Sequence, residues 1–212
     1  MVLMIAVPAL VFVAIVAIAI MGDAFQKRTE SVNAADAAAL AAAEQWRSYV
    51  VDKVDAADGR DSSAALPQLK QILDLNAATI DRAAVESRAM TLANKNGAEL
   101  YSLTKQRVGN YMEFTAVTRN LDAVNGTTAK PTATATVRVE FSGSICWASN
   151  SRLGLRYGNV CRGWSSLQNK IEDDTRQPEA PPATEENPTP TPPPAPKVKI
   201  HASFDASIIM AA

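Results

Sequence analysis

The chain has 212 residues, of which 20% are charged and 47% hydrophobic, and a formal net charge of -1. This size suits one modest domain with appendages, and excludes two full domains of ordinary length. Lys and Arg are spread along the chain and do not cluster, so the charge pattern gives no indication of a nucleic-acid partner.

The first segment is apolar: residues 1–22, MVLMIAVPALVFVAIVAIAIMG, contain no charged side chain. A run of this length is what a helix needs to cross the hydrocarbon core of a bilayer, about 30 Å thick, and we interpret it as a transmembrane helix. A cleaved signal peptide is the alternative, with Ala17-Ile18-Ala19 as a cleavage pattern, although the run is long for that class. Lys27 and Arg28 follow the span, which under the positive-inside rule conflicts with an extracytoplasmic domain.

Residues 23–58 are predicted to continue the helix as an alanine-rich amphipathic segment. Six of its side chains recur at spacings of three and four and form one stripe. They are Val32, Ala35, Ala39, Ala42, Trp46 and Tyr49. The stripe packs either on the protein's own domain or on a neighbouring subunit, and the sequence leaves both open.

This N-terminal region resembles the TadE/TadG-like proteins of the Flp (tight adherence) pilus assembly system. The resemblance rests on the apolar helix followed by FQKRTESVNAADAAALAAA, residues 25–43, and most specifically on Asn33 to Ala43. It implies a membrane-anchored, minor pilin-like or accessory subunit whose partners are the membrane and other pilus subunits. Larger relatives carry a von Willebrand type A domain with an Asp-x-Ser-x-Ser motif. The nearest string, DSSAA at residues 61–65, lacks the last serine, so we expect a short member without that domain.

Residues 59–177 are predicted to form an extracytoplasmic α+β domain. Gly59 is expected to end the long helix, and Ser62 or Ser63 to cap the next one. Two helical segments are expected between Leu66 and the stop at Asn96-Gly97. Their apolar positions are Leu69, Ile72, Leu73 and Leu75 in the first and Ile80, Ala84, Ser87, Met90 and Leu92 in the second. Alternating residues then predict an antiparallel hairpin of strands 111–119 and 132–142 around a turn at Asn125-Gly126.

Cys146 and Cys161 are the only two cysteines and enclose a loop rich in glycine, serine and asparagine. A zinc site needs four ligands, and the chain has a single histidine, so we favour a disulfide over two unpaired thiols. A disulfide would place the domain outside the cytoplasm and contribute about 3 kcal/mol. The loop carries aromatic and basic side chains that either form a partner-binding patch or cover the end of the core. The candidates are Trp147, Arg156, Tyr157 and Trp164.

Residues 178–196, PEAPPATEENPTPTPPPAP, favour polyproline II and form a linker or an excursion from the domain. Residues 197–212 alternate apolar and polar side chains, as in KVKIHASFDASIIM, so we predict that the chain returns to add a strand to the sheet.

No catalytic, metal or cofactor motif stands out, and we expect neither an enzyme nor a small-molecule substrate. The expected fold class is α+β, with an N-terminal transmembrane helix continuing into an amphipathic helix packed on a small antiparallel sheet, as in pilins. The expected function is Flp/Tad pilus assembly. The alternative is a membrane-anchored extracytoplasmic binding module that uses loop 146–161 and has no role in pili.

Overall fold

The computed structural model describes residues 2–149, 151–176 and 197–211, with side chains from Val11 onward. Its residues divide into two compact units, each of which is described by itself. The first unit comprises residues 1–47, 81–140 and 207–212, and the second comprises residues 48–80 and 141–206. The proline-rich segment predicted at 178–196 lies outside the described residues.

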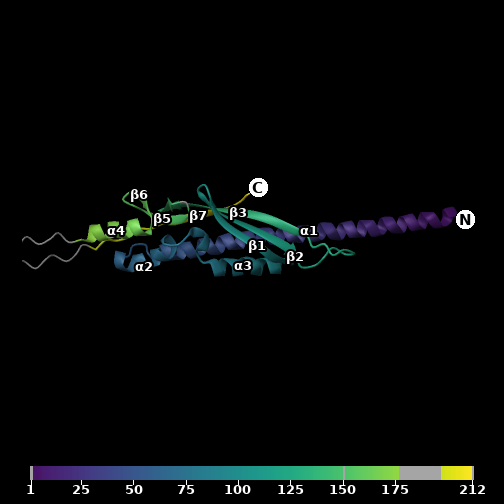
Figure 1. Ribbon diagram of the computed structural model, residues 1–212, viewed down its shortest axis with the longest axis horizontal. Coiled ribbons are helices and arrows are strands. Elements are labelled where there is room, and N and C mark those ends of the chain that lie inside the picture. Colours follow the sequence, from purple (N-terminus) through teal and green to yellow (C-terminus); the bar gives the residue numbers. More distant parts are fainter. Residues whose placement is uncertain (1, 150, 177–196, 212) are drawn as a thin grey trace, which may run out of the picture. The chain divides into compact units, whose positions relative to one another are not determined.

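Helix α1, Val2–Asp55, is continuous through the apolar segment and the alanine-rich segment, as the sequence predicts (Figure 1). No glycine follows Gly22 until Gly59, whose φ of +66° is one that most side chains disfavour and that suits the end of a helix. Across the residues that the structure describes, none of the helices combines the length and the apolar character needed to cross a bilayer.

The larger sheet has four strands in the order β1-β2-β3-β7. They are β1 Ala98–Val108, β2 Tyr111–Asn120, β3 Thr132–Gly143 and β7 Phe204–Met210. β1 pairs with β2 and β2 with β3, both antiparallel, so the predicted hairpin is present. β1 was not predicted, because its apolar and polar residues alternate only over part of its length. The C-terminal strand does join the sheet, but it begins at Phe204 and not at Lys197.

The core of the first unit lies between α1 and one face of this sheet. Trp46 on α1 is fully buried, and its ring centroid lies 6.0 Å from that of Phe114 on β2. The alanines that precede Trp46 on α1 let the helix come close to the strands, because each carries only one methyl group. The buried side chains on the sheet side are Met112, Phe114, Ala116, Ala135, Val137 and Val139.

Helix α3, Arg82–Lys95, packs on β1 through Val85, Ala89 and Ala93. The sequence predicted Met90 on the buried face of this helix, because methionine is larger and more hydrophobic than the neighbouring alanine. In the structure Met90 is 50% exposed and the smaller Ala89 is buried. A close contact between a helix and a strand leaves room for an alanine but not for a methionine.

Lys105 on β1 lies in the interface with α3, and its side chain is almost fully buried. Burial lowers the pKa of its amine, which has no hydrogen-bond partner among the described residues. The Glu86 carboxylate, 3.8 Å away, offsets part of the cost of removing this charge from water.

The second unit contains helix α2, Ser62–Leu73, the short 3-10 helix η1, Ala77–Thr79, and helix α4, Trp164–Thr175. Its sheet has the order β4-β5-β6, with β4 Ile145–Ser149, β5 Arg152–Tyr157 and β6 Val160–Arg162. The core is formed by Leu69, Ile72, Leu73, Leu153, Leu155, Leu167 and Ile171. The cysteine segment is therefore a small sheet and not the loop that its glycine and serine content suggested.

Two smaller predictions about α2 are wrong. Asp61 and not a serine occupies the N-cap position, and it forms no side-chain cap hydrogen bond. Leu75 lies beyond the end of the helix and is exposed.

The chain between residues 198 and 200 returns to the end of α1, where Gly59 donates a backbone hydrogen bond to Ile200 and Ile200 donates one to Arg60.

We predict that Trp46→Ala lowers the free energy of unfolding by about 3–5 kcal/mol, because it removes the largest buried side chain and leaves a cavity against Phe114. Urea unfolding of the purified protein would measure this. Met90→Ala, at an exposed position of α3, is the control and should change stability by no more than about 0.5 kcal/mol. Equal effects of the two substitutions would contradict the placement of the core.

Candidate functional site

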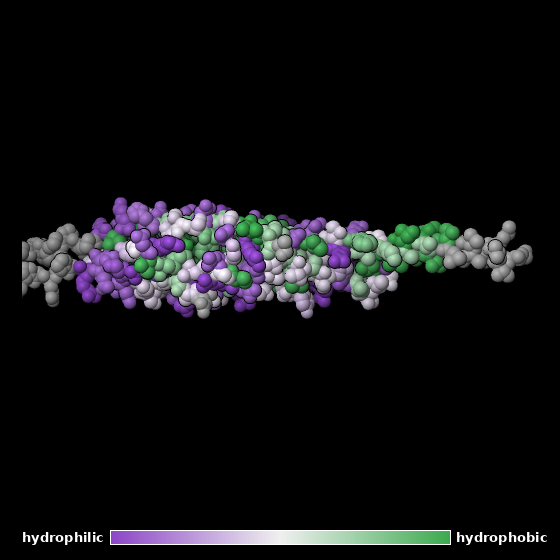
Figure 2. All heavy atoms as spheres, turned by 90° about the horizontal axis from the view of Figure 1, so that it is seen from above, coloured by the Kyte–Doolittle hydropathy of each residue, from purple (hydrophilic) through white to green (hydrophobic). Residues whose placement is uncertain are grey.

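The N-terminal part of α1 presents hydrophobic side chains to solvent on every side. Residues 11 to 22 are all exposed, and this run covers more than three turns of helix. The large exposed side chains are Val11, Phe12, Val13, Ile15, Val16, Ile18, Ile20, Met21 and Phe25. Figure 2 shows hydrophobic side chains gathered on the part of α1 that follows the grey N-terminal residues. A helix that is apolar all round is typical of a segment that another apolar phase or protein surrounds.

Immediately after this segment, three buried polar side chains hold α1 to the end of the sheet. Ser31, Thr118 and Asn120 are fully buried. Thr118 Oγ1 donates to the Ser31 carbonyl oxygen at 2.9 Å, and the Ser31 hydroxyl lies 3.0 Å from the carbonyl oxygen of Lys27 and 3.2 Å from that of Pro131. Each of these side chains is hydrogen-bonded, so burying it carries no penalty for a lost partner.

Asn120, at the end of β2, is the centre of this cluster. Its side-chain amide donates to the Lys27 carbonyl oxygen and to Glu30 Oε2, both at 3.2 Å. Its side-chain oxygen accepts from the backbone amide of Asp122 at 2.9 Å. One side chain therefore joins helix α1 to the chain that leaves β2.

Three charged side chains, those of Lys27, Glu30 and Asp122, lie around Asn120. Hydrogen bonds from the Gln26 and Asn120 amides lower the pKa of the Glu30 carboxyl. The hydrogen bond to Asp122, 3.2 Å away, raises the pKa of the Lys27 amine, which also lies 3.5 Å from Glu30. Both shifts favour the charged forms, so this group is a set of complementary charges at neutral pH.

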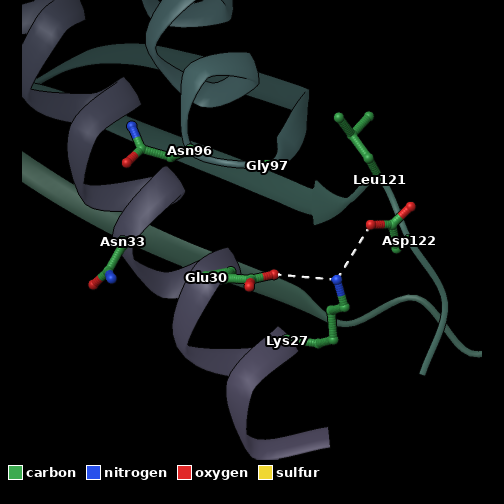
Figure 3. Close-up of a pocket in the computed structure, with 7 residues that line it drawn as sticks. All are labelled: Lys27, Glu30, Asn33, Asn96, Gly97, Leu121 and Asp122. Atoms are coloured by element: carbon green, nitrogen blue, oxygen red, sulfur yellow. Dashed lines mark hydrogen bonds and ion pairs between the residues drawn. The ribbon is translucent and has the colours of Figure 1, made fainter. Parts of the chain in front are cut away.

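These residues border a surface pocket with a volume of about 510 Å³. Figure 3 shows the Lys27 amine between the carboxylates of Glu30 and Asp122. The lining residues are Lys27, Glu30, Asn33, Asn96, Gly97, Leu121 and Asp122. The Lys27 amine is already paired with two carboxylates. The arrangement is therefore suited to joining α1 to the loop that follows β2, and not to binding an anion.

The comparison with protein families falls on this same helix. Residues 1–45 match the model of the putative Flp pilus-assembly TadE/G-like family. The resemblance predicted from the sequence is thereby confirmed over this segment. We call residues 1–45 the TadE/G-like segment; the match indicates involvement in Flp pilus assembly. Searches of curated proteins and of solved structures returned no match.

Within and just beyond the TadE/G-like segment, the predicted packing stripe is mostly internal. Ala35, Ala39, Ala42 and Trp46 are fully buried within the chain. Tyr49 is half-buried and its hydroxyl donates to the Gln71 side chain at 3.2 Å. In the structure, four of the six predicted positions therefore contact the protein's own core.

A different face of the TadE/G-like segment is open. Val32 is 42% exposed and Leu40 is 37% exposed, and Asn33 and Glu44 are exposed beside them. Counted from Val32, the other three positions lie 1, 8 and 12 residues along the helix, which at about 3.6 residues per turn places all four on one side of it. The sequence did not distinguish this side, because the alanines that surround it fit a buried and an exposed position equally well.

The cysteine segment lies in the second unit, where Cys146 and Cys161 form the predicted disulfide. It links β4 to β6 across the central strand β5 at Gly154, which pairs with Cys146. A Cβ atom at Gly154 would lie 3.0 Å from the Cys161 sulfur and 2.7 Å from the Arg162 carbonyl oxygen, so only glycine fits beneath the bond.

The structure does not show the four predicted partner residues of this segment as one patch. Two of them contact other residues of the second unit, and the other two lie at separate positions. Trp147 packs on Phe141 at 5.2 Å between ring centroids, and the Tyr157 hydroxyl donates to Asp174 at 2.9 Å. Trp164 begins α4 and lines a smaller pocket of about 180 Å³. Arg156 has an exposed side chain. Trp147 and Tyr157 are therefore both engaged by other residues of the second unit.

We predict that Asn120→Ala lowers the free energy of unfolding by about 1–3 kcal/mol, because it removes the donor to the Lys27 carbonyl oxygen and to Glu30 in a buried site. Urea unfolding would measure the loss. Asn94→Ala, exposed on α3, is the matched control. A loss no larger than that of the control would show that the cluster does not stabilise the fold.

A second prediction concerns how the stability of the fold depends on pH. The pKa of Glu30 is lower in the folded protein than in the unfolded chain, so its carboxylate stabilises the fold above the ordinary pKa of about 4.3. That contribution disappears as the pH falls through the folded-state pKa. Wild type should therefore be more stable than Glu30→Gln at neutral pH, and the difference should vanish in acid.

Chemical unfolding at a series of pH values would check this, with Glu44→Gln on the exposed face of the same helix as the control. A constant difference between wild type and Glu30→Gln from neutral to acidic pH would refute the assignment.

Proposed function

We propose that the protein is a membrane-anchored, minor pilin-like or accessory subunit in the assembly of a Flp/Tad-type pilus. The observation that carries this proposal is the family match over residues 1–45. From Val2 onward the matched residues form one uninterrupted part of α1, which includes the exposed apolar segment and the packed alanine-rich segment.

The membrane anchor in this proposal is residues 1–22. They contain no charged side chain, and Asp23 is the first charged residue of the chain. The described side chains from Val11 to Met21 are open to their surroundings, which suits contact with lipid. The disulfide supports an extracytoplasmic position for the second unit, because such bonds persist in oxidising compartments.

The surface proposed for other pilus subunits is the open side of α1 marked by Val32 and Leu40. It lies in the TadE/G-like segment, and its apolar side chains would be shielded from water by a neighbour. Ala39 and Ala42 are excluded as contact points while the fold is intact, because they are buried. The role is one of binding and support, and we propose no catalysis, cofactor or small-molecule substrate.

The alternative, an extracytoplasmic binding module that uses loop 146–161, finds less support. Its two aromatic side chains Trp147 and Tyr157 are engaged with Phe141 and Asp174. Side chains that already pack on or hydrogen-bond to other residues of the same unit are less available to an outside ligand.

Deletion of the gene should abolish or strongly reduce piliation, and the full-length wild-type protein should restore it. A photo-crosslinking amino acid at Leu40 should then capture another pilus component, because this side chain points away from the core. Immunoblotting and mass spectrometry of the crosslinked product would identify the neighbour.

The matched control places the same amino acid at Arg88, which is exposed on α3 outside the TadE/G-like segment. Normal pili after deletion of the gene would contradict the proposed role in assembly. Equal crosslinking from Leu40 and Arg88 would remove the α1 surface from consideration.

A further inference from the structure

The loop between β2 and β3, residues 121–131, runs alongside α1 toward the apolar segment (Figure 1). Besides the hydrogen bond between the Ser31 hydroxyl and the Pro131 carbonyl oxygen, two contacts nearer the apolar segment attach it to the helix. The backbone amide of Asn125 donates to Asp23 Oδ2 at 2.7 Å, and the Asp122 carboxylate lies 3.2 Å from the Lys27 amine. We refer to residues 121–131 as the β2–β3 loop.

The contact with Asp23 locates the loop at the boundary of the apolar segment. Asp23 directly follows residues 1–22, and Lys27 lies about 6 Å farther along the helix at 1.5 Å per residue. The tip of the loop is therefore level with the first charged residue, and its base is one turn farther from the apolar segment.

The tip has a defined shape and no charge. Val124 is buried and its backbone amide donates to Ala129, while the amide and the hydroxyl of Thr127 both donate to the Val124 carbonyl oxygen. Gly126 adopts a φ of +78°, which a side chain would disfavour. Asn125, Thr127 and Thr128 are exposed. The Thr127 hydroxyl and the Asn125 backbone amide are used within the protein, so the donors that the tip offers are the side-chain amide of Asn125 and the hydroxyl of Thr128.

We propose that the β2–β3 loop rests on the membrane surface, with its uncharged tip among the phospholipid headgroups, and thereby limits how deeply α1 inserts. This inference rests on the proposed anchoring of residues 1–22 in a bilayer. The side-chain amide of Asn125 and the hydroxyl of Thr128 donate to the phosphate oxygens of the lipid, and the absence of charge from Asn125 to Ala129 removes a barrier to close approach.

The hydrogen bond to Asp23 fits the same position. A carboxylate at the edge of the hydrocarbon core loses part of its hydration, which is costly unless the protein supplies a donor. The Asn125 amide supplies it. The loop therefore donates a hydrogen bond to Asp23, the first charged residue after the apolar segment. It also widens the protein beside Asp23, so that the helix cannot insert more deeply into the bilayer.

The test uses the full-length protein in vesicles of phosphatidylcholine and phosphatidylglycerol. Single cysteines at Thr127, Ile18 and Arg88 are labelled with a fluorophore under non-reducing conditions, so that the native disulfide stays closed. Quenching is compared for lipids that carry a nitroxide in the headgroup and for lipids that carry it in the acyl chain. Arg88 is the exposed control on α3.

We expect headgroup quenching at Thr127, acyl-chain quenching at Ile18 and neither at Arg88. Acyl-chain quenching at Ile18 without headgroup quenching at Thr127 would overturn the inference and leave the anchor intact. No quenching at Ile18 would overturn the anchor, and the inference with it.

A second variant tests the limit on depth. Thr128→Asp adds a charge to the exposed tip and should move the Ile18 label outward, seen as a loss of acyl-chain quenching and a gain of headgroup quenching. An unchanged urea midpoint would show that the fold is retained. Unchanged quenching at Ile18 in a folded Thr128→Asp protein would overturn the depth-limiting role.

Discussion

The close packing of the alanine face of α1 on the inner face of the larger sheet is the contact on which the first unit depends. A row of single methyl groups brings the helix backbone near the strands, and one large side chain, Trp46, fills the remaining space against Phe114. The same closeness brings Ser31 within hydrogen-bond distance of Thr118. The polar cluster at the end of the sheet is therefore a consequence of the alanine packing and not an independent feature.

That polar cluster determines how the helix is held along its length. Apolar packing alone tolerates a sliding helix, because the methyl groups are alike, whereas the bonds of Asn120 to Lys27 and Glu30 exist at one register only. The buried polar groups thus contribute specificity as well as stability. They also define where α1 leaves the sheet, and so where the exposed apolar segment begins. The β2–β3 loop contacts the helix at Asp23, directly after the apolar segment and within the TadE/G-like segment.

Some of this organisation could be predicted from residues alone. The long helix, the hairpin around Asn125-Gly126, the disulfide and the return of the chain to the sheet were predicted and are present. The errors have physical causes. β1 and the small sheet β4-β5-β6 have weak alternation or short strands, and on α3 the contact with β1 selected Ala89 over Met90 because the space is narrow. Asn120 and Ser31 gave no signal as site residues, since their partners are about ninety residues away in the chain.

For the alanine-rich part of α1, the sequence by itself determined that Val32 to Trp46 is helical and that small side chains dominate it, because propensity and spacing are local properties. It also determined the family resemblance over this segment, because the motif is contiguous. Only the tertiary structure decided which side of the helix is buried. Alanine is compatible with either side, so the choice depended on where the sheet, with Phe114 and Asn120, comes to rest.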